Sequence, residues 1–108
     1  MRGPVTQERM EDALQFLSDT DERCATLRSD MERAEFKAKR TKSAVFQISA
    51  GSVAERNALA DTHADTEEAY EQYFQAMRNY HAMNNRRTTE VIVVETWRSL
   101  NANRRQAQ

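Results

Sequence analysis

Apolar and small residues recur every seven positions through the first half of the chain. One series begins at Met10, and a second begins three residues later at Ala13. The first reads Met10, Leu17, Cys24, Met31, Ala38 and Val45, and the second reads Ala13, Thr20, Leu27, Ala34, Thr41 and Ile48. Neither series contains a charged residue, and Leu14, Phe16, Phe36 and Phe46 widen the stripe. This heptad predicts a long helix over about residues 6–48 that packs along one seam as a coiled coil.

A break follows at residues 49–52, which read Ser-Ala-Gly-Ser. Gly51 can take the left-handed conformation that ends a helix. Ser52 and Glu55 have the spacing of a capping box, which predicts a short helix over about residues 53–60. Asp61 or Thr62 can then cap a further helix. The pattern leaves open whether the backbone bends near Asp61–His63 or continues straight.

A second long helix is predicted over about residues 64–103. Its apolar stripe consists of Ala69, Tyr73, Ala76, Met77, Tyr80, Met83, Val91, Val94, Trp97 and Leu100. Arg87 occupies a position where an apolar residue is expected. The β-branched run 88–96 is typical of a strand, and a β-hairpin pairing 45–48 with 91–94 is the alternative. The helical flanks and the lack of turn residues around the run favour the helix.

Charge indicates how the two long helices pair. We suppose an antiparallel register in which facing residue numbers sum to about 108. In this register three blocks of opposite charge face one another. They are Glu8, Glu11 and Asp12 with Arg98, Arg104 and Arg105; Asp19, Asp21 and Glu22 with Arg86 and Arg87; and Lys37, Lys39, Arg40 and Lys42 with Asp65, Glu67, Glu68 and Glu71. The same register sets Leu17 against Val91, Phe16 against Ile92, Met31 against Met77, and Cys24 near Asn84. Exposed ion pairs contribute only about 0–1 kcal/mol each, so burial holds the hairpin and charge selects its register.

The fold class expected is therefore all-α: a long antiparallel coiled-coil hairpin with a short helix at the turn. Only two glycines and one proline occur, while 31% of residues are charged, which is typical of long solvated helices. We expect a single domain over 1–108 with flexible ends at 1–5 and 104–108.

Four consecutive apolar residues, 91–94, would point in every direction from a helix, and a hairpin covers only one side of it. We therefore expect self-association, as an isologous dimer that forms a helical bundle. The candidate interface residues are Val91, Ile92, Val93, Val94 and Trp97.

The sequence offers no pattern typical of an active site. His63 and His81 are too far apart in sequence for a helical metal pair, and Asp61, His63 and Asp65 are better explained as a solvated helix cap. Cys24 lies on the seam and is interpreted as a small core residue. No Gly-rich phosphate loop is present. We expect no enzyme activity, catalytic residue, metal, cofactor or small-molecule substrate.

Two basic clusters are candidates for contact with nucleic acid or a partner protein. Lys37 and Arg40 belong to the first, for which a salt-bridged solvated face is the alternative. Arg98, Arg104 and Arg105 belong to the second, where arginines can hold phosphates and Trp97 can stack on a base. The alternative there is a core Trp97 with arginines that favour a helix C-terminus.

The net charge and the distribution of apolar residues indicate where in the cell the protein is found. The formal net charge is −1, which gives no whole-molecule preference for nucleic acid or an anionic membrane. No run of apolar residues is long enough to span a bilayer, and a lone cysteine suits a reducing compartment. We expect a soluble intracellular protein without a membrane partner.

The ending 94–105, Val-Glu-Thr-Trp-Arg-Ser-Leu-Asn-Ala-Asn-Arg-Arg, follows a hairpin that contains Gly-Ser-Val-Ala-Glu-Arg at 51–56. Over about residues 31–105 the chain resembles small helical proteins of tailed bacteriophages and prophages, which are often encoded near recombination and replication genes. The resemblance implies a phage origin and a location in the host cytoplasm. It leads us to expect a non-enzymatic accessory protein that assists DNA recombination or replication by binding a protein and, as a further option, DNA. The alternatives are an inhibitor or adaptor that docks on a host enzyme, or a structural scaffold.

Overall fold

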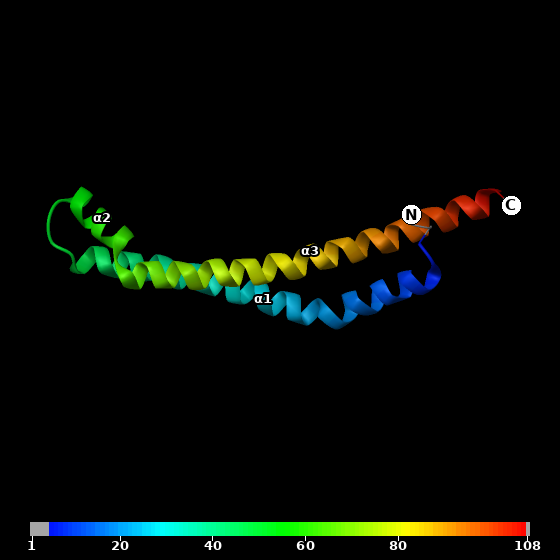
Figure 1. The fold of residues 1–108 in the computed structure, drawn as a ribbon, viewed down its shortest axis with the longest axis horizontal. Helices are drawn as coiled ribbons and strands as arrows, with labels where there is room; N and C mark the ends of the chain where they lie inside the picture. Colours follow the sequence, from blue (N-terminus) through cyan, green and yellow to red (C-terminus); the bar gives the residue numbers. More distant parts are fainter. Residues whose placement is uncertain (1–4, 108) are drawn as a thin grey trace. The chain divides into compact units, whose positions relative to one another are not determined.

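Residues 5–107 of the computed structural model are described, and they form three helices (Figure 1). These are α1 (Gln7–Ile48), α2 (Val53–Thr62) and α3 (Ala64–Ala107). The all-α prediction is confirmed. Val91–Val94 lie within α3, so the alternative of a β-hairpin is wrong. α3 also continues past the predicted end near residue 103 to Ala107, while residues 1–4 and 108 of the predicted flexible ends lie outside the described part.

Contacts divide the chain into two compact units. Unit 1 combines the chain up to Ala25 with the chain from His81 onward, and unit 2 is Thr26–Tyr80. Within each unit a stretch of α1 packs antiparallel against a stretch of α3, and α2 lies at the turn of unit 2. The predicted antiparallel helical hairpin is therefore confirmed, and the single domain over 1–108 stays a prediction.

The predicted seam of α1 is the side that packs. Every position of the two heptad series is buried or half-buried except Ile48, the last residue of the helix. In unit 1, Met10 and Ala13 pack with Val94, and Val5, Val93 and Trp97 cover this cluster. Ala13 and Ala38 are fully buried. Small side chains at these positions allow the α1 backbone to approach its partner helix closely.

The seam of α3 carries more polar residues than its apolar pattern predicts. Its positions seven apart include Thr66, Arg87 and Glu90, and all three are buried or half-buried. Val91, which was predicted to belong to the stripe, is instead exposed. Consecutive apolar residues do not indicate which side of a helix is buried. The seven-residue spacing of Glu90 and Trp97 does, and Val91 lies outside that series, so the prediction at Val91 was wrong.

The turn between α1 and α2 follows the predicted capping pattern. Gly51 has a φ of 113°, in the left-handed region that favours glycine. The hydroxyl of Ser52 accepts a hydrogen bond from the Glu55 backbone N–H at 3.1 Å and caps α2. Arg56 then donates through Nε to the carbonyl of Phe46 at 3.1 Å, while its guanidinium lies 4.2 Å from the centre of the Phe46 ring. Because the last turn of α1 has no basic residue of its own, Arg56 supplies the cation that its dipole favours.

The junction between α2 and α3 is a break at His63. This residue has extended backbone, with φ −66° and ψ 139°. Its Nδ1 accepts a hydrogen bond from the Asp65 N–H at 3.0 Å, so the imidazole caps α3. The prediction that Asp61 or Thr62 provides this cap is wrong. The Thr62 hydroxyl donates back to the Ala58 carbonyl instead, at 2.9 Å.

The predicted charge register holds in part. Arg87 pairs with Asp21 at 3.3 Å, as predicted. Lys42 pairs with Asp61 of α2 at 2.6 Å rather than with an acid of α3, and Lys39 pairs with Glu35 of its own helix at 3.2 Å. Near the start of α1 the ion pair has the reverse sign of the predicted one. Among the described residues, none of Glu8, Glu11 and Asp12 forms an ion pair, whereas the neighbouring Arg9 pairs with Glu90. The predicted apolar facing pairs and the Cys24–Asn84 neighbourhood stay predictions.

Candidate functional site

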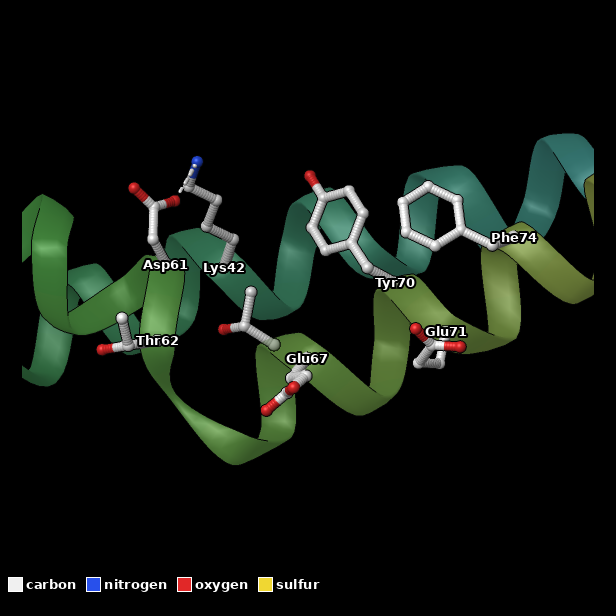
Figure 2. Close-up of a pocket in the computed structure, with 8 residues that line it drawn as sticks. Lys42, Asp61, Thr62, Glu67, Tyr70, Glu71 and Phe74 are labelled. Carbon is white, nitrogen blue, oxygen red and sulfur yellow. Dashed lines mark ion pairs between the residues drawn. The ribbon is translucent and has the colours of Figure 1, made fainter.

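A hollow in unit 2 lies where α1, α2 and α3 meet (Figure 2). It has a volume of about 620 Å³ and is open to solvent. The residues that line this groove are Lys42, Asp61, Thr62, Thr66, Glu67, Tyr70, Glu71 and Phe74. We call it the Tyr70–Phe74 groove.

One end of the groove is formed by the ion pair between Lys42 and Asp61. Nζ lies 2.6 Å from Oδ1, and the contact joins α1 to α2 (Figure 2). The hydrogen bond to Asp61, followed by its negative charge, raises the pKa of Lys42 above 10.5. Lys42 therefore stays protonated near neutral pH, and Asp61 largely neutralises it.

Aromatic rings form one wall of the groove. The Tyr70 and Phe74 centroids are 6.1 Å apart, and Tyr73 lies 6.5 Å from Tyr70 and 5.7 Å from Phe74. Figure 2 shows the Tyr70 and Phe74 rings on the same side of α3, with the carboxylates of Glu67 and Glu71 along the neighbouring face. Phe74 is 46% exposed. The wall is thus an accessible apolar surface beside negative charge.

Tyr73 is held from behind by Glu35 of α1. The two side chains share a hydrogen bond, which is the largest cause of a lowered pKa at Glu35 and of a raised pKa at Tyr73. This interaction joins α3 to α1 within unit 2.

Thr66 lines the groove but is almost completely covered. It is 3% exposed, and its hydroxyl has no hydrogen-bond partner among the described residues. A threonine in a helix commonly donates back to the carbonyl four residues earlier, as Thr62 does, but Thr66 does not. The hydroxyl is therefore a local energetic cost in the packing of unit 2.

The charge of the groove lining is negative. Lys42 is the single cation, and three carboxylates, those of Asp61, Glu67 and Glu71, accompany it. This balance disfavours phosphate and other anions as occupants. It favours a cation that can also contact an aromatic ring.

The candidate contacts Lys37 and Arg40 lie elsewhere in unit 2. Lys37 lines a smaller hollow of about 300 Å³ together with Asp65 and Glu68, two acids that the predicted register places opposite it. Arg40 lies 5.6 Å from the centre of the Phe36 ring on its own helix. The structure thus brings Lys37 toward acidic groups and Arg40 over an aromatic ring.

Among the described residues of unit 1, the most buried charged side chain is that of Glu90, which is 4% exposed. Arg9 donates a hydrogen bond from Nη2 to Oε1 of Glu90 at 3.0 Å. Its Nη1 lies 2.7 Å from Oε2, and this second contact is an ion pair that is not aligned as a hydrogen bond. Arg86 adds a weaker contact at 3.7 Å. The hydrogen bond from Arg9 outweighs the opposing effect of burial and lowers the pKa of Glu90 below 4.5.

Arg87 explains why a cation can occupy the seam. It donates from Nη1 to the Leu17 carbonyl at 2.7 Å and to the Thr20 hydroxyl at 2.6 Å, and it pairs with Asp21. Both terminal nitrogens of the guanidinium therefore have partners on α1. These bonds favour one register, since a shift of α3 by a turn would remove them.

The candidate interface run divides between the inside and the outside of unit 1. Val94 is buried, and Val93 and Trp97 pack against the Met10–Ala13 cluster. Val91 and Ile92 are 41% and 56% exposed. Only these last two side chains present substantial apolar surface outward.

Arg98, Arg104 and Arg105 are exposed along the last turns of α3. Within the described residues none of the three side chains has an ion pair or a hydrogen bond. Trp97, the proposed base-stacking ring, is half-buried in the core of unit 1. The arginines are thus available for contact, while the indole is largely used inside the unit.

Over residues 5–107 no group of three or more His, Cys, Asp or Glu side chains is arranged to hold a metal ion. The Nδ1 of His63 is used in the α3 cap, and Cys24 is free and half-buried on the seam. None of the described helices has a stretch that is apolar for the length of a bilayer crossing.

No protein-family model, curated protein or solved structure matches this chain.

Sequence reasoning missed the Tyr70–Phe74 groove and the Arg9–Glu90 pair. Tyr70 and Phe74 are four residues apart, a spacing that places two rings on one helix face. Glu90 stands seven residues before Trp97, in the same heptad series. The Tyr70–Phe74 spacing was overlooked because it lies beside the core stripe around Tyr73. The Glu90–Trp97 spacing was overlooked because seam positions were assumed to be apolar.

Proposed function

We propose that this chain is a non-enzymatic accessory protein of a tailed phage or prophage, which acts in the host cytoplasm and assists DNA recombination or replication by binding a protein partner. The single observation that carries the protein-binding part is the set of large hydrophobic side chains that the helix pairs leave exposed. The exposed large hydrophobic side chains are Leu14, Phe36, Ile48, Val53, Leu59, Phe74, Val91 and Ile92. Neighbouring exposed residues of this kind, such as Val91 and Ile92, are typical of interaction surfaces.

The position of these residues supports this proposal. Of these residues only Ile48, at the end of α1, belongs to a heptad series of the seam, so the others are additional to what the helix pairs need. The phage origin and the link to recombination and replication rest on the resemblance of residues 31–105 to phage helical proteins. The alternatives are an adaptor or inhibitor of a host enzyme, and a structural scaffold.

The experiment that tests the proposal is co-purification of the tagged full chain from phage-infected cells. Recovery of a recombination or replication protein is the expected result. Recovery of an unrelated host enzyme would favour the adaptor, and assembly into large particles without a partner would favour the scaffold. A variant with Phe36→Ser and Phe74→Ser, matched for expression, should recover less of the partner because it removes two exposed rings.

Direct DNA contact is a second candidate, favoured by the exposed arginines Arg98, Arg104 and Arg105. A gel-shift assay with single- and double-stranded DNA at about 50 mM salt tests it, since phosphate contacts weaken steeply as salt rises. We expect weak binding that is lost at about 200 mM salt and reduced when Arg104 and Arg105 are changed to Gln. Absence of any shift at low salt would remove DNA from the proposal.

The proposal also includes a homodimer formed through the exposed apolar residues of unit 1. Val91 and Ile92 are the side chains that support it, because Val93, Val94 and Trp97 are used within the unit.

A further inference from the structure

Arginine side chains cover three of the four phenylalanines in this chain. The guanidinium carbon of Arg86 lies 4.4 Å from the Phe16 centroid, that of Arg56 lies 4.2 Å from Phe46, and that of Arg40 lies 5.6 Å from Phe36. Each distance falls within the range of a cation–π contact. Among the described residues, Phe74 has no guanidinium over its ring, and the aromatic rings near it are those of Tyr70 and Tyr73.

The surroundings of Phe74 are suited to a guanidinium stacked on its ring. Phe74 and Tyr70 present adjacent rings toward the groove, and Glu67 and Glu71 lie on the neighbouring face of α3 (Figure 2). A guanidinium is planar and weakly hydrated, so it can stack on a ring and at the same time donate two hydrogen bonds to a carboxylate.

Other occupants fit the groove less well. An anion would meet three carboxylates, while the one cation, Lys42, is already bound by Asp61 at 2.6 Å. A purely apolar side chain would contact the rings but would desolvate Glu67 and Glu71 without a partner, which is costly. A lysine ammonium supplies charge but neither the flat stacking surface nor the two-pronged hydrogen bond.

We propose that the Tyr70–Phe74 groove binds an arginine side chain presented by a segment of a partner protein. The guanidinium stacks on Phe74 and Tyr70 and pairs with Glu67 and Glu71. This inference rests on the proposed protein-binding function and states the chemistry that the partner must carry.

The test uses the isotope-labelled full chain and three short peptides that are identical except at one central residue. The residue is arginine, lysine or citrulline, the last being a neutral analogue of arginine with nearly the same shape. We expect the arginine peptide to shift the backbone amide signals of residues 66–75. The lysine peptide should bind roughly fivefold more weakly, and citrulline should produce no comparable shifts. Equal binding of arginine and citrulline, or shifts confined to other residues, would overturn the proposal.

Matched variants assign the contacts within the groove. Phe74→Leu keeps an apolar side chain but removes the ring, and Glu71→Gln removes a charge at nearly constant size. Each should weaken the arginine peptide several-fold, as expected for loss of one cation–π or charged contact. Glu68→Gln, at a residue outside the groove lining, is the control and should leave binding unchanged.

Two further readouts keep the test decisive. Circular dichroism melting of each variant establishes that the helices persist, and a folded Phe74→Leu protein that binds as well as the unchanged chain contradicts the proposal. A peptide with the sequence of residues 97–106, which contains Arg98, Arg104 and Arg105, tests a second copy as the occupant. If it binds more tightly than the generic arginine peptide, the assignment to a different protein is overturned. Failure of all arginine peptides would remove this site without deciding the co-purification experiment.

Discussion

Thr66 shows how one buried hydroxyl can cost stability. The side chain is 3% exposed, and its oxygen has no hydrogen-bond partner within residues 5–107. Valine has nearly the same shape and the same branching at Cβ but needs no partner. We predict that Thr66→Val stabilises the protein by about 1 kcal/mol, because it removes an unsatisfied buried group. Urea unfolding followed by circular dichroism measures the change.

Thr41→Val is the control for this prediction. The Thr41 hydroxyl donates to the Lys37 carbonyl at 2.9 Å, so its removal deletes a hydrogen bond rather than an unpaired group. No gain in stability is expected there. A loss of stability in Thr66→Val would mean that the hydroxyl has a partner when the protein is in solution.

Glu90 should make the stability of unit 1 sensitive to acid. Arg9 lowers the pKa of this carboxyl below 4.5, so its ionised form is favoured more in the folded state than in the unfolded chain. The resulting stabilisation is fully present above the unfolded pKa and is lost as pH falls through the folded pKa. We predict that Glu90→Gln is less stable than the unchanged chain near neutral pH and loses less stability between about pH 5 and about pH 3.

Denaturant unfolding across this pH range measures the effect. The residual acid sensitivity of Glu90→Gln should come in part from Glu35, whose pKa the Tyr73 hydrogen bond also lowers. Glu95→Gln, an exposed position on the same helix, is the control and should follow the unchanged chain. Parallel pH profiles for Glu90→Gln and the unchanged chain would contradict the role given to Arg9.

At the scale of the element, the start of α3 depends on an unusual cap. The Nδ1 of His63 accepts the Asp65 N–H at 3.0 Å, a task that Ser, Thr, Asp or Asn commonly performs. We predict that His63→Ala destabilises the protein by about 1 kcal/mol and that His63→Ser recovers most of this loss. Chemical unfolding of the three proteins measures it. Equal stability of the Ala and Ser variants would show that the cap contributes nothing.

The close packing of α1 in unit 2 depends on Ala38, which is fully buried. A leucine there has no room without separating α1 from its partner helix. We predict that Ala38→Leu destabilises the protein by about 1–3 kcal/mol, although leucine is a good helix former. Ala44→Leu, on the exposed side of α1, should change stability little. Thermal melting of both variants separates packing from helix propensity, and equal melting temperatures would contradict the packing argument.

At the scale of the whole chain, the sequence was most informative where one signal repeated. The heptad from Met10 to Val45 predicts a buried seam over six repeats, and a single wrong position such as Ile48 does not change the fold. The turn was predictable because Gly51, Ser52 and Glu55 combine two local rules. Such redundancy is absent at individual contacts, so the helices could be predicted better than their ion pairs.

The parts that could not be predicted depend on interactions distant in sequence. The pattern around Glu90 does not reveal that Arg9, on the other helix, makes its burial favourable. Likewise, Asp61 and Thr62 are better capping residues than His63 on average, but Asp61 is engaged by Lys42 and Thr62 by the Ala58 carbonyl. The groove requires residues of three helices, so only its Tyr70–Phe74 spacing was visible in the sequence.

Self-association is the expected consequence of the apolar surface left on unit 1. Burial of one isoleucine side chain contributes about 1.5–3 kcal/mol, and in a two-fold symmetric dimer each Ile92 is buried once per copy. We predict a concentration-dependent dimer, measured by sedimentation equilibrium at tens of micromolar. Ile92→Glu should raise its dissociation constant by more than about tenfold, because it removes this burial twice and introduces two charges.

Leu59→Glu provides the matched control for Ile92→Glu. Leu59 is similarly exposed, but it belongs to α2 of unit 2. If both variants weaken the dimer equally, association is a general effect of exposed apolar residues and the interface has no fixed position. If the unchanged chain is monomeric throughout, Val91 and Ile92 are left available to a different protein, since Val93, Val94 and Trp97 are already packed within unit 1.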